Sequence, residues 1–162
     1  MNKVLVGFDG SESAHHAVAF AVDLAKRYEA SLCVLVVART PDWGALEFER
    51  NEVVEREVKH CEEILDEIKA KLADLTTLPV QFDLVVGQPA KEIVLYAEKH
   101  DMDHVVVGHR GHTLFDRWLI GSVARQVIAY APCAVTIVRD RSADKPMRAR
   151  AARHADTETP LV

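Results

Sequence analysis

The hydrophobic residues of the chain gather in five short runs, separated by longer segments that mix apolar and polar positions. The runs are rich in β-branched residues, which favour strands. Residues 4–6 and 105–107 are continuously apolar, as strands buried on both faces are, whereas residues 80–84 alternate between apolar and polar side chains, as an edge strand does. The pattern therefore predicts two central strands and one edge strand among five, which cover residues 4–8, 32–37, 80–86, 104–107 and 134–138.

The segments that follow the first and fourth runs carry helix signals. Ser11 or Ser13 is placed to cap a helix whose apolar residues lie on one stripe, and this helix should end near Glu29. A further helix is expected to begin near Gly121 and to stop before Pro132, because a proline disfavours helical backbone at the residue before it.

The segment after the second run has apolar residues from Val54 to Leu75 at alternating steps of four and three. This is heptad spacing, which fits either a coiled coil or an amphipathic helix lying on a sheet. Only three heptads occur and they sit between two strands, so the helix on a sheet is favoured. Pro89 suits the first turn of another helix after the third run.

Strands that alternate with helices predict a single α/β domain with a mostly parallel sheet and helices on both faces. The chain has 162 residues, of which 49% are hydrophobic, and this is enough to bury one core. We assign the domain to residues 1–139. Residues 140–162 have no periodic apolar face and are predicted to form a flexible tail.

Composition limits the classes of partner. A net charge of −5 argues against a nucleic-acid-binding or membrane-surface protein, which is usually strongly basic. No apolar stretch approaches the roughly 18 residues of a membrane span and no leader is evident, so a cytoplasmic protein is expected. Cys33, Cys61 and Cys133 lie far apart, which indicates neither a disulfide framework nor a zinc site. The partner is expected to be a small molecule or another protein.

Glycines after the fourth run indicate an anion site. Gly108 and Gly111 follow the apolar run directly, and Gly121 and Ser122 stand at the expected helix start, giving the spacing G-x2-G-x9-G-S. Glycine allows close approach of a ligand to the backbone, and the first N–H groups of a helix point at an anion placed there. The spacing predicts a phosphate cradle, although Gly121 and Ser122 could serve only as a helix cap and Gly108 only as a tight turn.

This motif resembles that of the universal stress protein (UspA-like) family, in its ATP-binding members. The similarity extends to the first strand and its Asp-Gly-Ser turn (KVLVGFDGSE, 3–12), to a strand–helix junction (GQPAKEI, 87–93) and to the last strand (APCAVTIV, 131–138). It implies a flavodoxin-like fold of the adenine nucleotide alpha hydrolase type, with five strands in the order 3-2-1-4-5. In this order the winding direction reverses between the first and fourth strands, and ligands bind beyond the carboxyl ends at that point.

The resemblance also implies a ligand and the residues that bind it. The ligand would be ATP, with Mg accompanying the phosphates, or else AMP or cyclic AMP. Asp9 would accept hydrogen bonds from the nucleoside, and it could also cap the first helix with Glu12, alone or in addition to that contact. Arg110 could pair with a phosphate or be a solvated loop residue. The complete set of expected contacts is Asp9, Gly10, Ser11, Val37, Ala38, Val107, Gly108, Arg110, Gly111, Gly121, Ser122 and Val123.

The motif does not predict an efficient enzyme. The chain has no G-x-x-x-x-G-K-[ST] sequence, so no lysine is placed to reach the β- and γ-phosphates, and no nucleophile with an attendant base can be assembled. His109 and His112 lie in a loop without further ligand-like neighbours, so no metal site is predicted there. We expect a stress-response regulator that works by binding. Slow ATP hydrolysis, autophosphorylation or nucleotidyl transfer is the alternative.

The last predicted strand indicates how copies of the chain could associate. Residues 134–138 are apolar and lie at an edge of the sheet in the order given above. Exposed edges are templates for pairing, so a twofold homodimer through this strand is predicted, and the family resemblance implies the same arrangement. A further, unidentified protein partner would respond to the nucleotide-bound state.

Overall fold

The computed structural model describes residues 1–40, 47–109 and 120–139. Five parallel strands form one sheet in the order β3-β2-β1-β4-β5. The strands are β1 (Lys3–Phe8), β2 (Ser31–Arg39), β3 (Val80–Gly87), β4 (His104–Gly108) and β5 (Ala134–Val138), and the helices are α1 (Glu12–Tyr28), α2 (Glu47–Leu75), α3 (Pro89–Lys99) and α4 (Ser122–Tyr130). The fold class, the strand order, the edge position of β3 and the interior positions of β1 and β4 are all confirmed.

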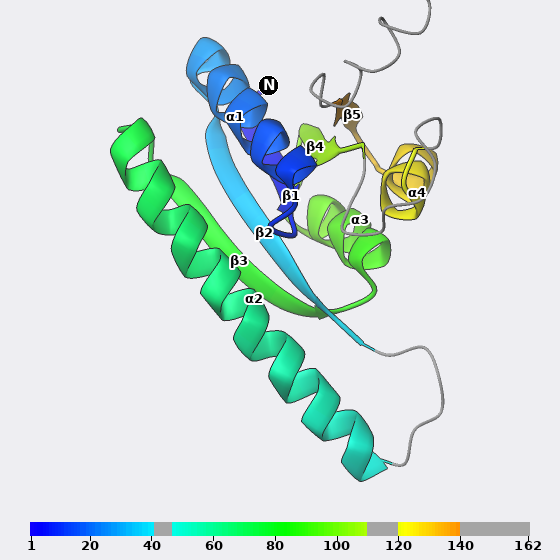
Figure 1. Cartoon of the computed structure of the whole chain (residues 1–162). Coiled ribbons are helices and arrows are strands. Elements are labelled where there is room, and N and C mark those ends of the chain that lie inside the picture. The colour runs from blue at the N-terminus through cyan, green and yellow to red at the C-terminus, as the bar shows by residue number, and fades with distance from the viewer. Residues whose placement is uncertain (41–46, 110–119, 140–162) are drawn as a thin grey trace, which may run out of the picture.

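Helices cover both faces of the sheet (Figure 1). The apolar side chains divide into two clusters, one under α1 and α2 and one under α3 and α4. Successive residues of a strand point to opposite faces. Thus Val34 and Val36 of β2 belong to the α1/α2 cluster, whereas Cys33 and Leu35 belong to the α3/α4 cluster.

Helix α2 lies along the sheet, as its amphipathic pattern predicted. Cys61, Leu65, Ile68 and Leu72 are each less than 10% exposed and pack in the α1/α2 cluster. The heptad spacing therefore serves contact with the sheet instead of a coiled coil. No helix in the described ranges combines the length and apolarity that crossing a membrane needs.

The start of α1 decides between the predicted capping residues. Ser11 is the N-cap, since its side chain accepts a hydrogen bond from the Ala14 N–H at 3.2 Å. Asp9 does not cap this helix, and its Oδ1 accepts instead from the Ser11 N–H at 3.0 Å. The alternative in which Asp9 caps α1 is therefore wrong. Glu29 ends the helix in a left-handed conformation, at the predicted position.

Candidate functional site

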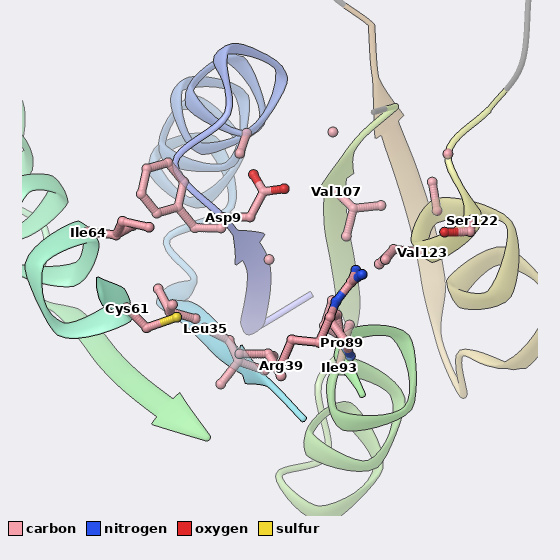
Figure 2. Close-up of a pocket in the computed structure, with 18 of the residues that line it drawn as sticks. Asp9, Leu35, Arg39, Cys61, Ile64, Pro89, Ile93, Val107, Ser122 and Val123 are labelled. Atoms are coloured by element: carbon pink, nitrogen blue, oxygen red, sulfur yellow. The ribbon is translucent and has the colours of Figure 1, made fainter. Parts of the chain in front are cut away.

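A cavity of about 390 Å³ opens at the carboxyl end of the sheet, beside β1 and β4 (Figure 2). The chain leaves β1 toward α1 on one face and leaves β4 toward α4 on the other, so the cavity lies where the winding direction reverses. Its volume is within the range of small-molecule sites. The described lining residues include Gly7, Phe8, Asp9, Val37, Arg39, Glu57, His60, Cys61, Ile64, Pro89, Ile93, Val107, Gly108, Gly121, Ser122 and Val123.

The helices that begin at this end of the sheet differ in what satisfies their first N–H groups. Helix α1 is capped by Ser11. Helix α3 begins with Pro89, which has no N–H. Helix α4 has Gly121 as its N-cap and no side-chain capping bond, and both Ser122 and Val123 line the cavity. The first turn of α4 is therefore best suited to receive an anion.

Gly121 requires a correction to the predicted cradle. Its N–H donates to the His109 carbonyl at 2.8 Å, so this amide is already used within the protein. This N–H is therefore not open to a phosphate oxygen in this structure, and Gly121 stays a predicted contact because it lines the cavity. The bond ties the start of α4 to the segment that follows β4, which leaves Ser122 and Val123 as the predicted amide donors of the helix.

Asp9 is exposed and lies directly after β1, where its carboxylate points toward the space between β1 and β4 (Figure 2). The bond from the Ser11 N–H to Oδ1 fixes the orientation of the carboxylate.

Gly10 and Ser11, which were also expected to contact the ligand, lie outside the cavity lining. Gly10 has a φ of +79°, which favours glycine, and packs beside Ile64, while Ser11 caps α1, and neither is among the described lining residues.

Of the strand-end residues expected to contact the ligand, some line the cavity and one does not. Val37 and Val107 line the cavity, whereas Ala38 is completely buried on the α1/α2 face. Gly108 lines the cavity as predicted, but its lack of a side chain has a second cause. A Cβ atom there would lie 2.8 Å from the carbonyl carbon of Ser13, so glycine is needed where α1 crosses the end of β4. Arg110 and Gly111 lie outside the described residues.

Sequence reasoning missed one whole wall of the cavity. Glu57, His60, Cys61 and Ile64 reach it from α2, and Arg39 reaches it from the end of β2. The apolar spacing of α2 predicted that Cys61 is buried, but it did not indicate that the helix lines a cavity. Burial, with a smaller effect from Glu57, raises the pKa of the Cys61 thiol to about 11. Cys61 is therefore protonated at neutral pH and forms an apolar wall.

Histidine and acidic residues do not gather around a common point in the described part of the chain. No group of three or more His, Cys, Asp or Glu side chains that could hold a metal ion occurs there. His109 is buried, with Nδ1 3.1 Å from the Ser13 hydroxyl, and His112 lies outside the described residues. The Ser13 contact adds to the packing of α1 on the end of β4.

Comparison with known proteins identifies the family. The profile of the universal stress protein family matches residues 1–139, which span all five strands. The chain belongs to the universal stress protein family. Universal stress protein MJ0531 of Methanocaldococcus jannaschii is 32% identical over 139 residues, covering 85% of this chain and 81% of the relative.

Two solved structures of universal stress proteins have the same fold. Universal stress protein UspA from Lactobacillus plantarum superposes with a TM-score of 0.77 at 27% identity, covering 85% of this chain and 97% of the other. A universal stress protein in complex with cAMP superposes with a TM-score of 0.64 at 24% identity, covering 85% of this chain and 96% of the other. These likenesses agree with the strand order described above.

Proposed function

We propose that this universal stress protein binds an adenine nucleotide in the cavity at the carboxyl end of the sheet and regulates a stress response through that binding. The observation that carries the proposal is the uncapped start of α4, which opens onto the same cavity as the Asp9 carboxylate. One end of the cavity thus offers hydrogen-bond donors and the other offers acceptors. A nucleotide has the complementary arrangement, with anionic phosphates and a nucleoside rich in donors.

Each part of the nucleotide has a partner in this proposal. The N–H groups of Ser122 and Val123 and the Ser122 hydroxyl hold a phosphate, helped by about 0.3–1 kcal/mol from the helix dipole. Asp9 accepts from ribose hydroxyls or from the exocyclic amine of adenine. Val37 and Val107 provide apolar contact for a flat ring.

ATP, with Mg accompanying its phosphates, is the nucleotide we propose first, and AMP and cyclic AMP are the alternatives. The related structure with cAMP supports the adenine nucleotide class, although it does not decide the number of phosphates. Bound nucleotide would stabilise one arrangement of the cavity walls, and a protein partner would bind that state. Binding is proposed as the function, and slow hydrolysis or phosphoryl transfer is the second candidate.

The test is to identify the ligand directly. Mass spectrometry of small molecules released from freshly purified, denatured protein should detect an adenine nucleotide, and calorimetry with ATP, AMP, cyclic AMP and GTP should rank them. Incubation with ATP and Mg should give little product. Failure of every adenine nucleotide to bind would refute the proposal, and rapid turnover would favour the enzyme. The cytoplasmic location stays a prediction that cell fractionation would test.

We further propose that two copies associate through β5. This strand pairs only with β4 within the described residues, so its other edge is open. The Val138 carbonyl accepts from the His109 N–H, which places the backbone groups of Val138 toward β4. Because these groups alternate in direction along a strand, those of Val135 and Ile137 point to the open edge.

This alternation provides a selective variant. Val135→Pro removes an outward N–H while keeping the bonds to β4, so it should convert the dimer to a monomer in sedimentation experiments. Circular dichroism should show that the fold is retained. A wild-type protein that is monomeric at all concentrations would contradict the proposed dimer.

A further inference from the structure

Arg39 is a cavity residue that the family resemblance did not indicate. It is the last residue of β2 and lines the cavity. Side chains alternate along a strand, so Arg39 shares a face with Leu35 and Val37, whose side chains pack on the α3/α4 side. Figure 2 shows the Arg39 side chain passing Pro89 with its guanidinium directed toward Val107 and Val123. This cation therefore extends toward the first turn of α4.

The backbone that carries Arg39 is held in place. Arg39 pairs with Gly87 of β3, and the N–H of the next residue, Thr40, donates to the Gly87 carbonyl at 3.2 Å. The Gln88 side-chain amide donates to the Thr40 carbonyl at 3.1 Å. These bonds join the end of β2 to the start of α3, so Arg39 projects from a fixed position at the rim of the cavity.

Charge is unevenly distributed in the cavity wall. Among the described lining residues, Arg39 carries the permanent positive charge, and Asp9 and Glu57 are the carboxylates. No ion pair joins Arg39 to another side chain in the described part of the protein. Glu57 belongs to α2, which packs on the opposite face of the sheet. The guanidinium and the open amides of α4 thus come from the α3/α4 side of the sheet, and Glu57 comes from the α1/α2 side.

We infer that Arg39 is a specificity-determining residue that binds the phosphates of the ligand together with the first turn of α4. This inference rests on the nucleotide-binding function proposed above. A guanidinium stays charged at every physiological pH and presents a planar set of donors that match two phosphate oxygens. Ligands with several phosphates should therefore bind more tightly than monophosphates, and adenosine should gain nothing from Arg39.

The test compares wild-type protein with Arg39→Gln by calorimetry, using ATP, AMP, adenosine and inorganic tripolyphosphate as probes. Arg39→Gln should weaken ATP and tripolyphosphate binding by about 10- to 100-fold, the range for hydrogen bonds to charged groups. It should also reduce the dependence of ATP affinity on salt and leave adenosine affinity unchanged. The ATP affinity of Arg39→Lys should lie between those of wild type and Arg39→Gln, because lysine keeps the charge but loses the paired donors.

The control is Arg27→Gln, an exposed residue in the last turn of α1, at the opposite end of the helix from the cavity. It makes the same change in net charge and should leave every affinity unchanged, and thermal unfolding should show that both variants fold. Equal ATP affinity in Arg39→Gln and wild type would overturn the role of Arg39 while the proposed function stands. If Arg39→Gln weakened adenosine and ATP binding equally, the phosphate role of Arg39 would be overturned, and stacking of the guanidinium on the base would replace it. A wild-type protein that binds none of the probes would refute the proposed function and this inference together.

Discussion

The sheet has a cavity of about 390 Å³ at each end, and the two cavities differ in how their polar groups are used. The cavity at the amino end is lined by residues of β1, β2 and β3 and by His100 and Met102. The side chains of Lys3 and Ser31 donate to nearby backbone carbonyls, and those of Cys33 and Gln81 bond to Tyr96. The cavity at the carboxyl end has an uncapped helix start and a guanidinium without an ion-pair partner among the described residues.

The bonds at the amino end are numerous. The Asp103 carboxylate accepts from the N–H groups of Asn2 and Lys3, and these bonds lower its pKa below the usual value. Lys3 Nζ donates to the His100 carbonyl at 2.8 Å. The Ser31 hydroxyl donates to the Asn2 carbonyl at 3.2 Å. Volume alone therefore does not identify a binding site, because polar groups that are already bonded have little to offer a ligand.

The comparison leads to a general expectation. Substitutions at the amino end should change stability and leave nucleotide affinity intact. Substitutions of Arg39 or of the first turn of α4 should weaken nucleotide affinity and leave stability intact. Gly108 belongs to both groups, since it lines the cavity at the carboxyl end and also packs against α1.

The largest effect on stability is expected from Gly108→Ala. The new Cβ would lie within 3.0 Å of the Ser13 side chain, carbonyl carbon and carbonyl oxygen, so backbone must move, at a cost of about 3 kcal/mol. Gly121→Ala is the matched control in the same motif, because its φ of −56° suits alanine and the cost should stay below about 1 kcal/mol. Urea denaturation measures both. A Gly108→Ala variant of normal stability with lost nucleotide binding would mean that this glycine serves the ligand.

A smaller loss is expected from Tyr96→Phe on α3. The Tyr96 hydroxyl donates to the Asp83 carboxylate, accepts from Gln81 Nε2 at 3.3 Å and lies 3.3 Å from the Cys33 sulfur. Removing a buried hydroxyl with these partners should lower the free energy of unfolding by about 1–2 kcal/mol without changing nucleotide affinity. Tyr28→Phe, at the exposed end of α1, should change stability by less than about 0.5 kcal/mol. A change in affinity with Tyr96→Phe would show that the two ends are coupled.

Two serines at opposite ends of the sheet form a matched pair. Ser122→Ala should weaken ATP binding by about 2- to 10-fold through loss of one hydrogen bond, with little change in unfolding. Ser31→Ala, which removes a bond to the Asn2 carbonyl, should leave ATP affinity unchanged. Calorimetry with both variants measures the difference. Equal affinities in the two variants would remove Ser122 from the proposed site.

The smallest expected effect is a pH dependence of stability from His104. Burial lowers the pKa of His104 below its ordinary value of 6.5, and its Nε2 lies 2.8 Å from the Thr136 hydroxyl. The unfolded chain therefore binds a proton at higher pH than the folded protein does. Stability from this residue is complete above pH 6.5 and falls as the pH drops through the folded pKa. His104→Gln should reduce the dependence of the free energy of unfolding on pH, measured by urea titrations between pH 7 and pH 5. An unchanged dependence would contradict a lowered pKa of His104.

His15 provides the comparison for that experiment. Its pKa is also lowered, first by burial and then by Lys71, so it contributes a slope of the same sign. The double variant His15→Gln/His104→Gln should therefore show a smaller slope than His15→Gln or His104→Gln alone.

Local patterns predicted the elements of the fold well. The strands extend the predicted runs by no more than two residues at either end, because β-branched runs mark buried strands. The strand order depended on the family resemblance, since spacing along the chain does not determine which strands become neighbours. The edge position of β3 was visible in its alternating pattern.

The site was predictable only where its contacts are local in sequence. Asp9, Ser122 and Val123 follow from strand ends and a helix start. Arg39 and the α2 wall could not be found in this way, because they reach the cavity through the packing of distant segments. The same reason explains the bond from Gly121 to His109, which no spacing rule predicts.

The contact between Gly108 and Ser13 has an evolutionary consequence. A larger residue at position 108 meets the main chain of α1, and Ser13 is itself buried with its hydroxyl 3.1 Å from His109. A bulkier residue at position 108 is therefore not accommodated alone, so relatives that carry one should have a compensating change at position 13 or a shifted first helix. Divergence of ligand preference within the family is then expected to proceed through the end of β2 and the start of α4, where side chains line the cavity.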